Sequence, residues 1–260
     1  MKMKSEMDDL CAAVLNAGLA ILGVAEDGLE AKQKINHDPV TKADLMANRI
    51  LYESLAAKYS HYGWLSEETH DDRSRLSKER VWIVDPLDGT REFTEYRPEY
   101  AVSVALVEEG IPVIAAVYNP ATNEFFTAVR GAGIWLNGES IRGKSWRGNR
   151  LSILASRSQF GSGKFESFEA YAQIHPIGSV AYKLALVAAG KADATFSLEP
   201  KNEWDIAAGV LMVEEAGGTV TDKTGITFVF NRPDTLVNGI IAATSGAYDP
   251  LQRLIADHGI

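Results

Sequence analysis

"WIVDPLDGTREF", residues 82–93, ends a short apolar run with two aspartates, a glycine and a threonine. Two carboxylates about 4 Å apart repel each other by about 4 kcal/mol at an effective dielectric constant near 20. A wet, aspartate-rich turn tolerates this repulsion, whereas a cleft needs a cation to offset it. Hard oxygen ligands favour Mg²⁺, which binds carboxylates together with substrate phosphate oxygens. The stretch therefore predicts a magnesium and phosphate site at the end of a buried strand, where Gly89 lets the backbone approach the ligand.

The spacing of the aspartates separates this stretch from another phosphatase chemistry. Haloacid-dehalogenase-type phosphatases carry an aspartyl nucleophile in D-x-D-G-T, whereas Pro86 and Leu87 stand between the two aspartates here. The extra residue breaks the alternation that would point both carboxylates of a regular strand at one site. We therefore exclude that class. Cys11 is the only cysteine and the histidines show no paired spacing, so a zinc site is not expected either.

The composition is that of a globular protein with an acidic balance of charge. The 260 residues are 46% hydrophobic and 23% charged, with a formal net charge of −9. A nucleic-acid polymer is not an expected partner, because such binding requires clustered basic residues. The one dense basic stretch, residues 141–150, is glycine-rich and typical of a connector. A single cysteine and an N-terminus without a signal-peptide core predict a soluble, cytoplasmic protein with no membrane partner.

Hydrophobic periodicity divides the chain into two halves. Residues 1–148 predict an α+β lobe that carries the metal-binding motifs, with two helices on an antiparallel sheet. Residues 149–260 predict an α/β lobe in which strands and helices alternate, and the two lobes should form one compact catalytic unit. The expected elements are helices over 5–33, within 35–60, and over 164–173, 179–190 and 202–218, strands over 80–85, 151–156, 174–178 and 192–197, a β-meander over 99–138, and a final helix.

Three further acidic residues could complete a metal site. Glu67 follows a short expected strand, although such a glutamate alone is more often a surface charge. Asp205 lies in the first turn of an apolar helix, where an aspartate also offsets the helix dipole. Asp44 follows Thr41 by three residues, the spacing of a helix-capping pair. Each has an ordinary structural explanation, and only the whole set points to catalysis.

Five segments, in this order, resemble the inositol monophosphatase family of Mg²⁺-dependent, lithium-sensitive phosphatases. They are "DPVTKAD" (38–44), "SEET" (66–69), "WIVDPLDGTREF" (82–93), "GAGIWLNG" (131–138) and "EWDIAAG" (203–209). The resemblance implies a mixed α+β and α/β fold, a layered αβαβα sandwich of the inositol monophosphatase and fructose-1,6-bisphosphatase type. It also implies a homodimer that hydrolyses a small phosphorylated metabolite with metal-activated water.

The resemblance assigns the metal ligands by position. Glu67, Asp85 and the Leu87 carbonyl would hold one Mg²⁺ ion. Asp85, Asp88 and Asp205 would hold a second, so that Asp85 bridges the two. Two or three ions are expected at each active site. The repulsion between neighbouring aspartates is then offset by bound cations.

The catalytic and phosphate-binding residues follow from the same resemblance. Thr90, hydrogen-bonded to Asp44, would orient the attacking water, and Glu67 belongs with them to the catalytic set. The phosphate would lie against Asp88 and the backbone N–H groups of Gly89 and Thr90. No covalent phosphoenzyme is expected.

Two segments bear on the identity of the phosphate ester. Arg91-Glu92-Phe93 resembles the 3′(2′),5′-bisphosphate nucleotidase branch more than the inositol-phosphate branch, where Thr-Asn-Phe is usual. "LASRS" (154–158) also resembles the nucleotidases, which makes Ser156 and Arg157 candidate substrate contacts. Gln159 replaces the histidine of the nucleotidases, and their Gly-Pro-Thr segment is missing before Glu203.

The favoured substrate is therefore a 3′(2′),5′-bisphosphate nucleotide such as adenosine 3′,5′-bisphosphate, and the alternative is inositol 1-phosphate. A second phosphate requires an added cation, for which Arg157, Lys183 and Lys201 are candidates. A remote alternative is a non-catalytic regulatory partner of transcription or RNA processing. All the expected ligand positions are filled, which favours catalysis.

Overall fold

The computed structural model describes residues 2–27, 31–33, 39–161, 165 and 168–257. The helices are α1 (Lys2–Asp27), α2 (Lys42–Leu51), α3 (Thr90–Thr94), α4 (Arg157–Gly161), α5 (Val180–Ala188), α6 (Glu203–Glu215) and α7 (Tyr248–Asp257), with a π-helical turn η1 (Tyr52–Ala56) and a 3₁₀ turn η2 (Ser74–Ser77). The strands are β1 (Ala31–Gln33), β2 (Pro39–Thr41), β3 (Gly63–Ser66), β4 (Arg80–Asp88), β5 (Ala101–Glu108), β6 (Ile111–Asn119), β7 (Glu124–Val129), β8 (Gly133–Leu136), β9 (Glu139–Ile141), β10 (Leu151–Ser156), β11 (Ala172–Ile177), β12 (Ala194–Ser197), β13 (Lys201–Asn202), β14 (Thr219–Thr221), β15 (Leu236–Val237) and β16 (Ile240–Ala243).

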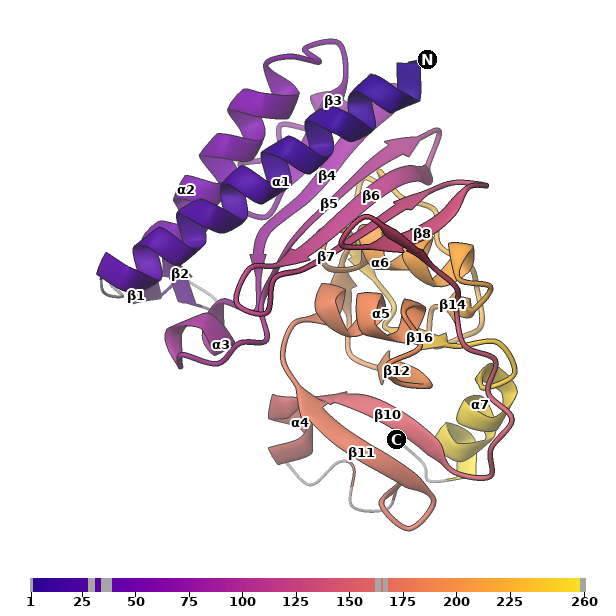
Figure 1. Ribbon diagram of the computed structural model, residues 1–260. Helices are drawn as coiled ribbons and strands as arrows, with labels where there is room; N and C mark the ends of the chain where they lie inside the picture. The colour runs from indigo at the N-terminus through magenta and orange to yellow at the C-terminus, as the bar shows by residue number, and fades with distance from the viewer. Residues whose placement is uncertain (1, 28–30, 34–38, 162–164, 166–167, 258–260) are drawn as a thin grey trace.

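The first half of the chain builds a sheet whose strands are ordered β3-β4-β5-β6-β7-β8-β9. Only β3 and β4 are parallel to each other, and the following pairs are antiparallel. The chain passes from β4 to β5 through a segment that contains α3, and from β5 onward each strand returns through a short turn. Helices α1 and α2 cover one face of this sheet (Figure 1). Leu10, Val14, Ala17 and Ile21 recur at helical spacing along α1 and are fully buried against that face.

Helices α5 and α6 lie between the large sheet and a second sheet ordered β11-β10-β12-β16-β14 (Figure 1). They are apolar on nearly all sides because both layers pack against them, and one hydrophobic cluster joins them to the large sheet and to the second sheet. The outer face of the second sheet packs on α7 and on Phe165 and Phe168. The layers therefore run helix, sheet, helix, sheet, helix, which confirms the αβαβα sandwich.

Most predicted elements are present, with differences at their ends. The first helix ends at Asp27; the predicted continuation through 28–30 lies outside the described residues, and 31–33 form strand β1. The strand predicted over 80–85 continues to Asp88. The helix predicted over 164–173 is wrong for its described part, because residues 168–171 form turns and Ala172 begins β11, while 164 and 166–167 lie outside that part.

Helix α1 also has the length and apolar composition of a membrane-spanning helix. Residues 3–26 are long and apolar enough to cross a membrane. A core helix of a soluble protein passes the same test, and α1 packs one face on the large sheet through buried leucine, valine and isoleucine side chains.

Candidate active site

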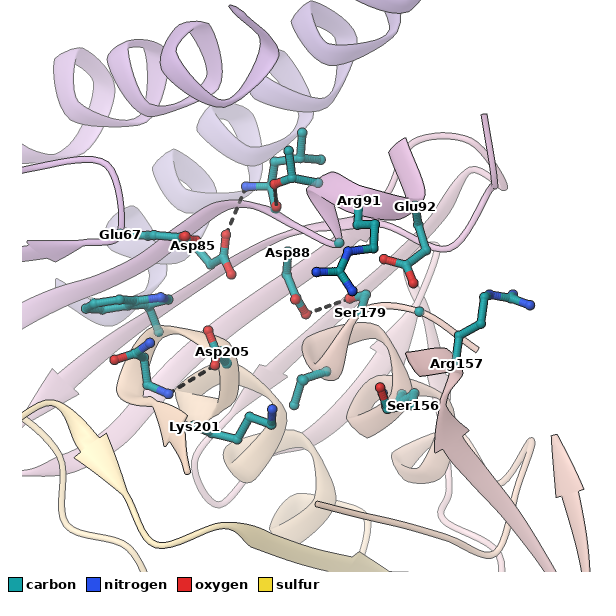
Figure 2. Close-up of a pocket in the computed structure, with 18 of the residues that line it drawn as sticks. Glu67, Asp85, Asp88, Arg91, Glu92, Ser156, Arg157, Ser179, Lys201 and Asp205 are labelled. Atoms are coloured by element: carbon teal, nitrogen blue, oxygen red, sulfur yellow. Dashed lines mark hydrogen bonds between the residues drawn. The ribbon is translucent and has the colours of Figure 1, made fainter. Parts of the chain in front are cut away.

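A cavity of about 560 Å³ opens where β4 ends, between the large sheet and the N-terminal ends of α5 and α6. Figure 2 shows the side chains around it. Its lining brings together the following predicted site residues: Glu67, Asp85, Leu87, Asp88, Gly89, Thr90, Ser156, Arg157 and Asp205. Asp44 is the one predicted residue outside this lining, and it reaches the site through Thr90.

A bulge in β4 explains how aspartates three residues apart serve one cavity. Asp85 pairs with Ser103 of β5 and Asp88 pairs with Ala101, so β4 carries one more residue than its partner between these two pairs. In a regular strand, positions three apart face opposite sides of the sheet, and the extra residue brings the second carboxylate to the side of the first. The Leu87 N–H donates to Asp85 Oδ1 at 3.0 Å and fixes the turn.

Gly89 follows this bulge in a conformation that suits glycine. Its φ is 98°, and a Cβ atom there would lie 2.9 Å from the Glu99 carbonyl oxygen. A residue with a side chain would be strained here, both by the left-handed backbone and by the close approach to Glu99. The glycine thereby lets the chain pass directly from β4 into α3, with Thr90 at the first helical position.

Hydrogen bonds also orient the other two aspartates, Asp88 from the start of α5 and Asp205 from the residue that caps its own helix. Asp88 Oδ2 accepts from Ser179 Oγ and from the Ala181 N–H, both at 2.6 Å. Asp205 Oδ2 accepts from the Asn202 N–H at 3.0 Å, as part of a capping box at the start of α6. The hydrogen bonds found among the described residues engage one carboxylate oxygen of each aspartate. The other oxygen is left to face the cavity.

Glu67 is held next to β4 by its backbone. Its N–H donates to the Val84 carbonyl at 3.2 Å, which extends the pairing of β3 and β4 by one residue. Glu67 and Asp85 therefore project from neighbouring strand ends, as Figure 2 shows.

Burial raises the pKa of each aspartate in the cluster, and neighbouring carboxylates add to this for Asp85 and Asp205. Burial raises the pKa of Asp85 well above its ordinary value, and the charges of Glu67, Asp88 and Asp205 add to this. Burial also raises the pKa of Asp88, although hydrogen bonds from Ser179 and Ala181 oppose the rise. The pKa of Asp205 is raised to about 8, first by burial and then by Asp88. These charges are costly to hold together in the protein alone.

The donor chemistry of this cluster suits a hard divalent cation. Among the described residues, no three His, Cys, Asp or Glu side chains are already arranged as a metal site. The fit rests instead on four carboxylates around one cavity, on their mutual repulsion, and on the cavity-facing oxygens of the three aspartates. A cation among them would offset the cost of their burial, and Mg²⁺ prefers such oxygen ligands.

Asp44 and Thr90 connect α2 to the cavity. Thr90 Oγ1 lies 2.8 Å from Asp44 Oδ1 and 3.0 Å from the Leu87 carbonyl oxygen. The other Asp44 oxygen accepts from the Thr41 N–H and from Thr41 Oγ1, both at 2.6 Å. Asp44 is 2% exposed. It therefore caps its helix and contacts Thr90 at the same time, so the two interpretations of this residue are compatible.

Basic side chains line the same cavity as the carboxylates. Lys183 is 4% exposed, and no hydrogen bond of its ammonium or of the Lys201 ammonium is found among the described residues. Burial lowers the pKa of Lys183 to about 8, against the attraction of Asp88. Arg157 also lines the cavity, but its Nη2 donates to Glu99 Oε1 at 2.7 Å, so that its charge is already paired.

Sequence reasoning missed Ser179, which orients Asp88. Ser179 is the N-cap of α5, where its hydroxyl also accepts from the Tyr182 N–H at 3.0 Å. Its φ of 57° is unusual for a residue with a side chain, and such strain is often found at functional sites. A serine just before an apolar helix is a capping signal that could have drawn attention to it. Its contact across to β4 could not have been predicted from local sequence.

A family model and several known proteins match most of this chain. The model of the inositol monophosphatase family matches residues 3–258. The chain is 37% identical over 208 residues to Nus factor SuhB of Escherichia coli K12, covering 76% of this chain and 77% of that protein. It is 39% identical over 204 residues to an inositol-1-monophosphatase of Caulobacter vibrioides, covering 74% and 79%.

A solved structure shares the whole fold. The extragenic suppressor protein suhB from Bartonella henselae superposes with a TM-score of 0.86 at 32% identity, over 98% of this chain and 100% of that one. The family match covers the carboxylate cluster, its supporting helices and both sheets. The chain belongs to the inositol monophosphatase family, whose members are metal-dependent phosphatases of small phosphate esters.

Proposed function

We propose that this chain is a Mg²⁺-dependent phosphomonoesterase whose metal ligands are the carboxylates around the cavity. The observation that carries the proposal is the convergence of Glu67, Asp85, Asp88 and Asp205 on one cavity next to Gly89. Glu67, Asp85 and the Leu87 carbonyl would hold one Mg²⁺ ion, and the three aspartates would hold another, with two or three ions per site. Bound Mg²⁺ supplies an activated water and stabilises the leaving oxygen.

The residues of the chain itself orient the reactants. When the Thr90 hydroxyl donates to Asp44, its lone pairs are free to accept a hydrogen bond from the attacking water. Asp44 is in turn fixed by Thr41, so the hydroxyl is held in one orientation. The backbone N–H groups of Gly89 and Thr90 would donate to the phosphate. Glu67 lies on the metal side of the same cavity and completes the catalytic set.

The basic side chains of the cavity favour a substrate with two phosphates. The buried ammonium of Lys183 and the ammonium of Lys201 both line the cavity, and neither donates a hydrogen bond within the described part of the chain. A second phosphate would satisfy them, which supports a 3′(2′),5′-bisphosphate nucleotide such as adenosine 3′,5′-bisphosphate. Ser156 lies in the same lining as a candidate substrate contact.

Inositol 1-phosphate is the second candidate substrate. The observation that favours it is the pairing of Arg157 with Glu99, which removes one of the three cations expected to read a second phosphate. The Caulobacter relative is named an inositol-1-monophosphatase, which agrees with this alternative. The two substrates therefore have to be compared directly.

The deciding experiment measures inorganic phosphate release with Mg²⁺ from adenosine 3′,5′-bisphosphate and from inositol 1-phosphate at matched concentrations. Asp88→Asn is the inactive control, and Lys183→Met tests the role of a buried ammonium in the cavity. We expect a preference for the bisphosphate that falls in Lys183→Met, with inositol 1-phosphate affected less. A preference for inositol 1-phosphate in the wild-type chain would overturn the nucleotide assignment. No release from either, in wild type as in Asp88→Asn, would overturn the phosphatase assignment.

Two further properties belong to the same proposal. Lithium should inhibit, because a small cation could occupy one metal position as product leaves, and the chain should form a homodimer. Lithium titrations at limiting Mg²⁺ and light scattering of the purified protein test them separately. Unchanged activity at millimolar lithium would contradict the proposed inhibition.

A regulatory role is a candidate because the E. coli relative is named a Nus factor. The Asp88→Asn chain separates this role from catalysis. If a cell lacking the native protein recovers with Asp88→Asn as well as with the wild-type chain, regulation is the function that matters there. If only the active chain restores it, phosphatase activity is the required function.

A further inference from the structure

A buried polar network lies behind the carboxylate cluster without lining the cavity. At its centre is Arg75, whose side chain is 1% exposed. Its Nε and Nη2 donate to the two Asp71 carboxylate oxygens at 3.1 and 2.9 Å. Its Nη1 donates to Asn231 Oδ1 at 2.7 Å, and its Nη2 also donates to the Arg232 carbonyl at 2.9 Å. Arg75 thus connects the loop after β3 to residues 231–232.

Glu203 connects the same two residues to the start of α6. Its side chain is fully buried, and its two oxygens accept from the Asn231 N–H at 2.7 Å and from the Arg232 N–H at 2.9 Å. The Glu203 N–H donates to the Thr235 carbonyl at 2.9 Å. Asn231 has a φ of 61°, a conformation that costs free energy in a residue with a side chain. The hydrogen bonds around it hold that conformation in place.

The network joins two segments that each carry a proposed metal ligand. Glu67 lies at the start of the loop that contains Asp71 and Arg75, whereas Asp205 lies two residues after Glu203 in the first turn of α6. These segments are far apart in sequence and belong to different layers of the fold. Arg75 and Glu203 both bind residues 231–232, and through them they link the backbone positions of the two ligands.

The chemistry of the network suits it to fixing the positions of backbone atoms more than to stabilising the fold. Burying a carboxylate and a guanidinium removes both from water, and apolar side chains of similar volume often stabilise a protein as well or better. Directional hydrogen bonds provide what apolar packing does not, a fixed distance between particular backbone atoms. Groups that orient metal ligands commonly change metal affinity 10–100-fold when they are removed.

We infer that Arg75 and Glu203 are positioning residues that set the separation of Glu67 and Asp205 for Mg²⁺ binding. This inference rests on the proposed function, because it concerns the same metal site. Neither residue lines the cavity, so their effect has to pass through the loop after β3 and the first turn of α6.

The test is Mg²⁺ binding to the full-length protein, measured by isothermal titration calorimetry, together with the Mg²⁺ concentration that gives half-maximal phosphate release. We expect Arg75→Met and Glu203→Ala each to weaken Mg²⁺ binding about tenfold. The kcat at saturating Mg²⁺ should change less than about threefold, because the groups that contact substrate are intact. Arg75→Lys keeps the charge but loses the planar fork of the guanidinium, so we expect Mg²⁺ binding to weaken about threefold. This variant tests the inference if Arg75→Met fails to fold.

Arg80→Met is the matched control. Arg80 is another arginine with little exposure, and its side chain pairs with Glu6 and Glu108 at 2.9 and 2.6 Å, on the α1 side of the large sheet. It should lower the melting temperature by a similar amount without changing Mg²⁺ affinity. If Arg75→Met and Glu203→Ala lose only stability, as Arg80→Met does, the positioning inference is overturned and the phosphatase proposal stands. If the wild-type chain binds no Mg²⁺ and releases no phosphate, the proposed function fails and this inference fails with it.

Discussion

The Thr90 hydroxyl makes the most specific prediction at the scale of single residues. Thr90→Ala removes the hydroxyl that we propose orients the attacking water. The hydrogen bonds that orient Asp85, Asp88 and Asp205 stay intact. Proton-handling groups in a reaction typically contribute 10²–10⁴-fold, so we expect kcat to fall by about 100-fold or more. Mg²⁺ affinity should stay within about twofold.

Thr90→Ser is the control for that prediction, because it restores the hydroxyl without the methyl group and should recover most of the activity. Steady-state kinetics and calorimetry of both variants provide the measurement. A Thr90→Ala protein that lost Mg²⁺ but kept its turnover per occupied site would contradict the assignment of Thr90 to the water.

Tyr182 makes a pH-dependent prediction. Burial, together with its hydrogen bond to Glu124, raises the pKa of Tyr182 to about 12 from an ordinary 10.0. Above pH 10 the unfolded chain therefore loses this proton while the folded chain retains it, so folding stability falls as the pH rises. The loss is fully present only above pH 12, and at pH 11.5 it should be about 2 kcal/mol.

Urea unfolding at pH 9 and pH 11.5, in the wild type and in Tyr182→Phe, isolates this effect from those of the other tyrosines. The wild type should lose about 2 kcal/mol more than the variant between the two pH values. Equal losses would show that the Tyr182 proton is not retained in the folded state.

At the scale of elements, the regular parts of the fold are predictable because their patterns are local. The meander from β5 to β8 follows from alternating apolar residues and turn signals, and α6 follows from its start at Asn202 and its stop at Gly217. The wrong helix over 164–173 has a different cause. Phe165 and Phe168 are spaced as on a helix, yet both rings pack against Phe196 under the second sheet. Their ring centroids lie 5.3 and 5.6 Å from that of Phe196. Tertiary packing determined the conformation there.

The bulge in β4 shows how far spacing alone can be used. The separation of Asp85 and Asp88 excludes a regular strand with both carboxylates on one side, and this correctly separates the chain from D-x-D-G-T phosphatases. The extra residue that restores a common orientation becomes visible only in the pairing of β4 with β5. Candidate ligands could thus be named from the sequence, whereas the reason for their convergence could not.

Helix packing gives a prediction for two glycines with opposite outcomes. Gly209 of α6 lies so close to α5 that an added Cβ would be 2.4 Å from Leu184 Cβ. Gly209→Ala should destabilise the protein by about 2 kcal/mol, because overpacking outweighs the higher helix propensity of alanine. Gly23 of α1 has no atom within 4 Å of the same position. Gly23→Ala should therefore stabilise by about 0.5–1 kcal/mol.

Equilibrium urea denaturation of the two variants measures both values. If Gly209→Ala proved as stabilising as Gly23→Ala, the close approach of α5 and α6 would be disproved.

At the scale of the whole molecule, the site is assembled from segments spread over most of the chain, from Asp44 to Asp205. A resemblance to a family could connect these segments, because each carries a short and specific motif. The supporting roles of Ser179, Arg75 and Glu203 could not be predicted from sequence motifs, because their partners are on other elements. The division into lobes at residues 148–149 stays a prediction, and the cluster that joins α5 and α6 to the large sheet makes the halves interdependent.

Metal removal should affect the stability of the entire fold. Without Mg²⁺ the buried carboxylates repel one another, and with Mg²⁺ at about 100 times its Kd the folded state gains about 2.7 kcal/mol. For a protein of this size, that corresponds to a rise in melting temperature of about 5–10 °C. Scanning calorimetry with EDTA and with Mg²⁺ measures it.

Asp88→Asn provides a second test in the same calorimetry experiment. The variant has one charge fewer in the cluster, so it should melt above the wild type in EDTA and gain less from Mg²⁺. A wild-type melting temperature that is the same in both buffers would contradict a carboxylate metal site.

The position of α5 and α6 between two sheets also has a consequence during synthesis. The large sheet is complete once residue 141 has left the ribosome, but the helices that cover its inner face end only at Glu215. At about 5–20 residues per second, the nascent chain exposes an apolar sheet face to solvent for roughly 4–15 s. Chaperone capture during translation should therefore be concentrated on chains of intermediate length, after the sheet has emerged and before α6 has.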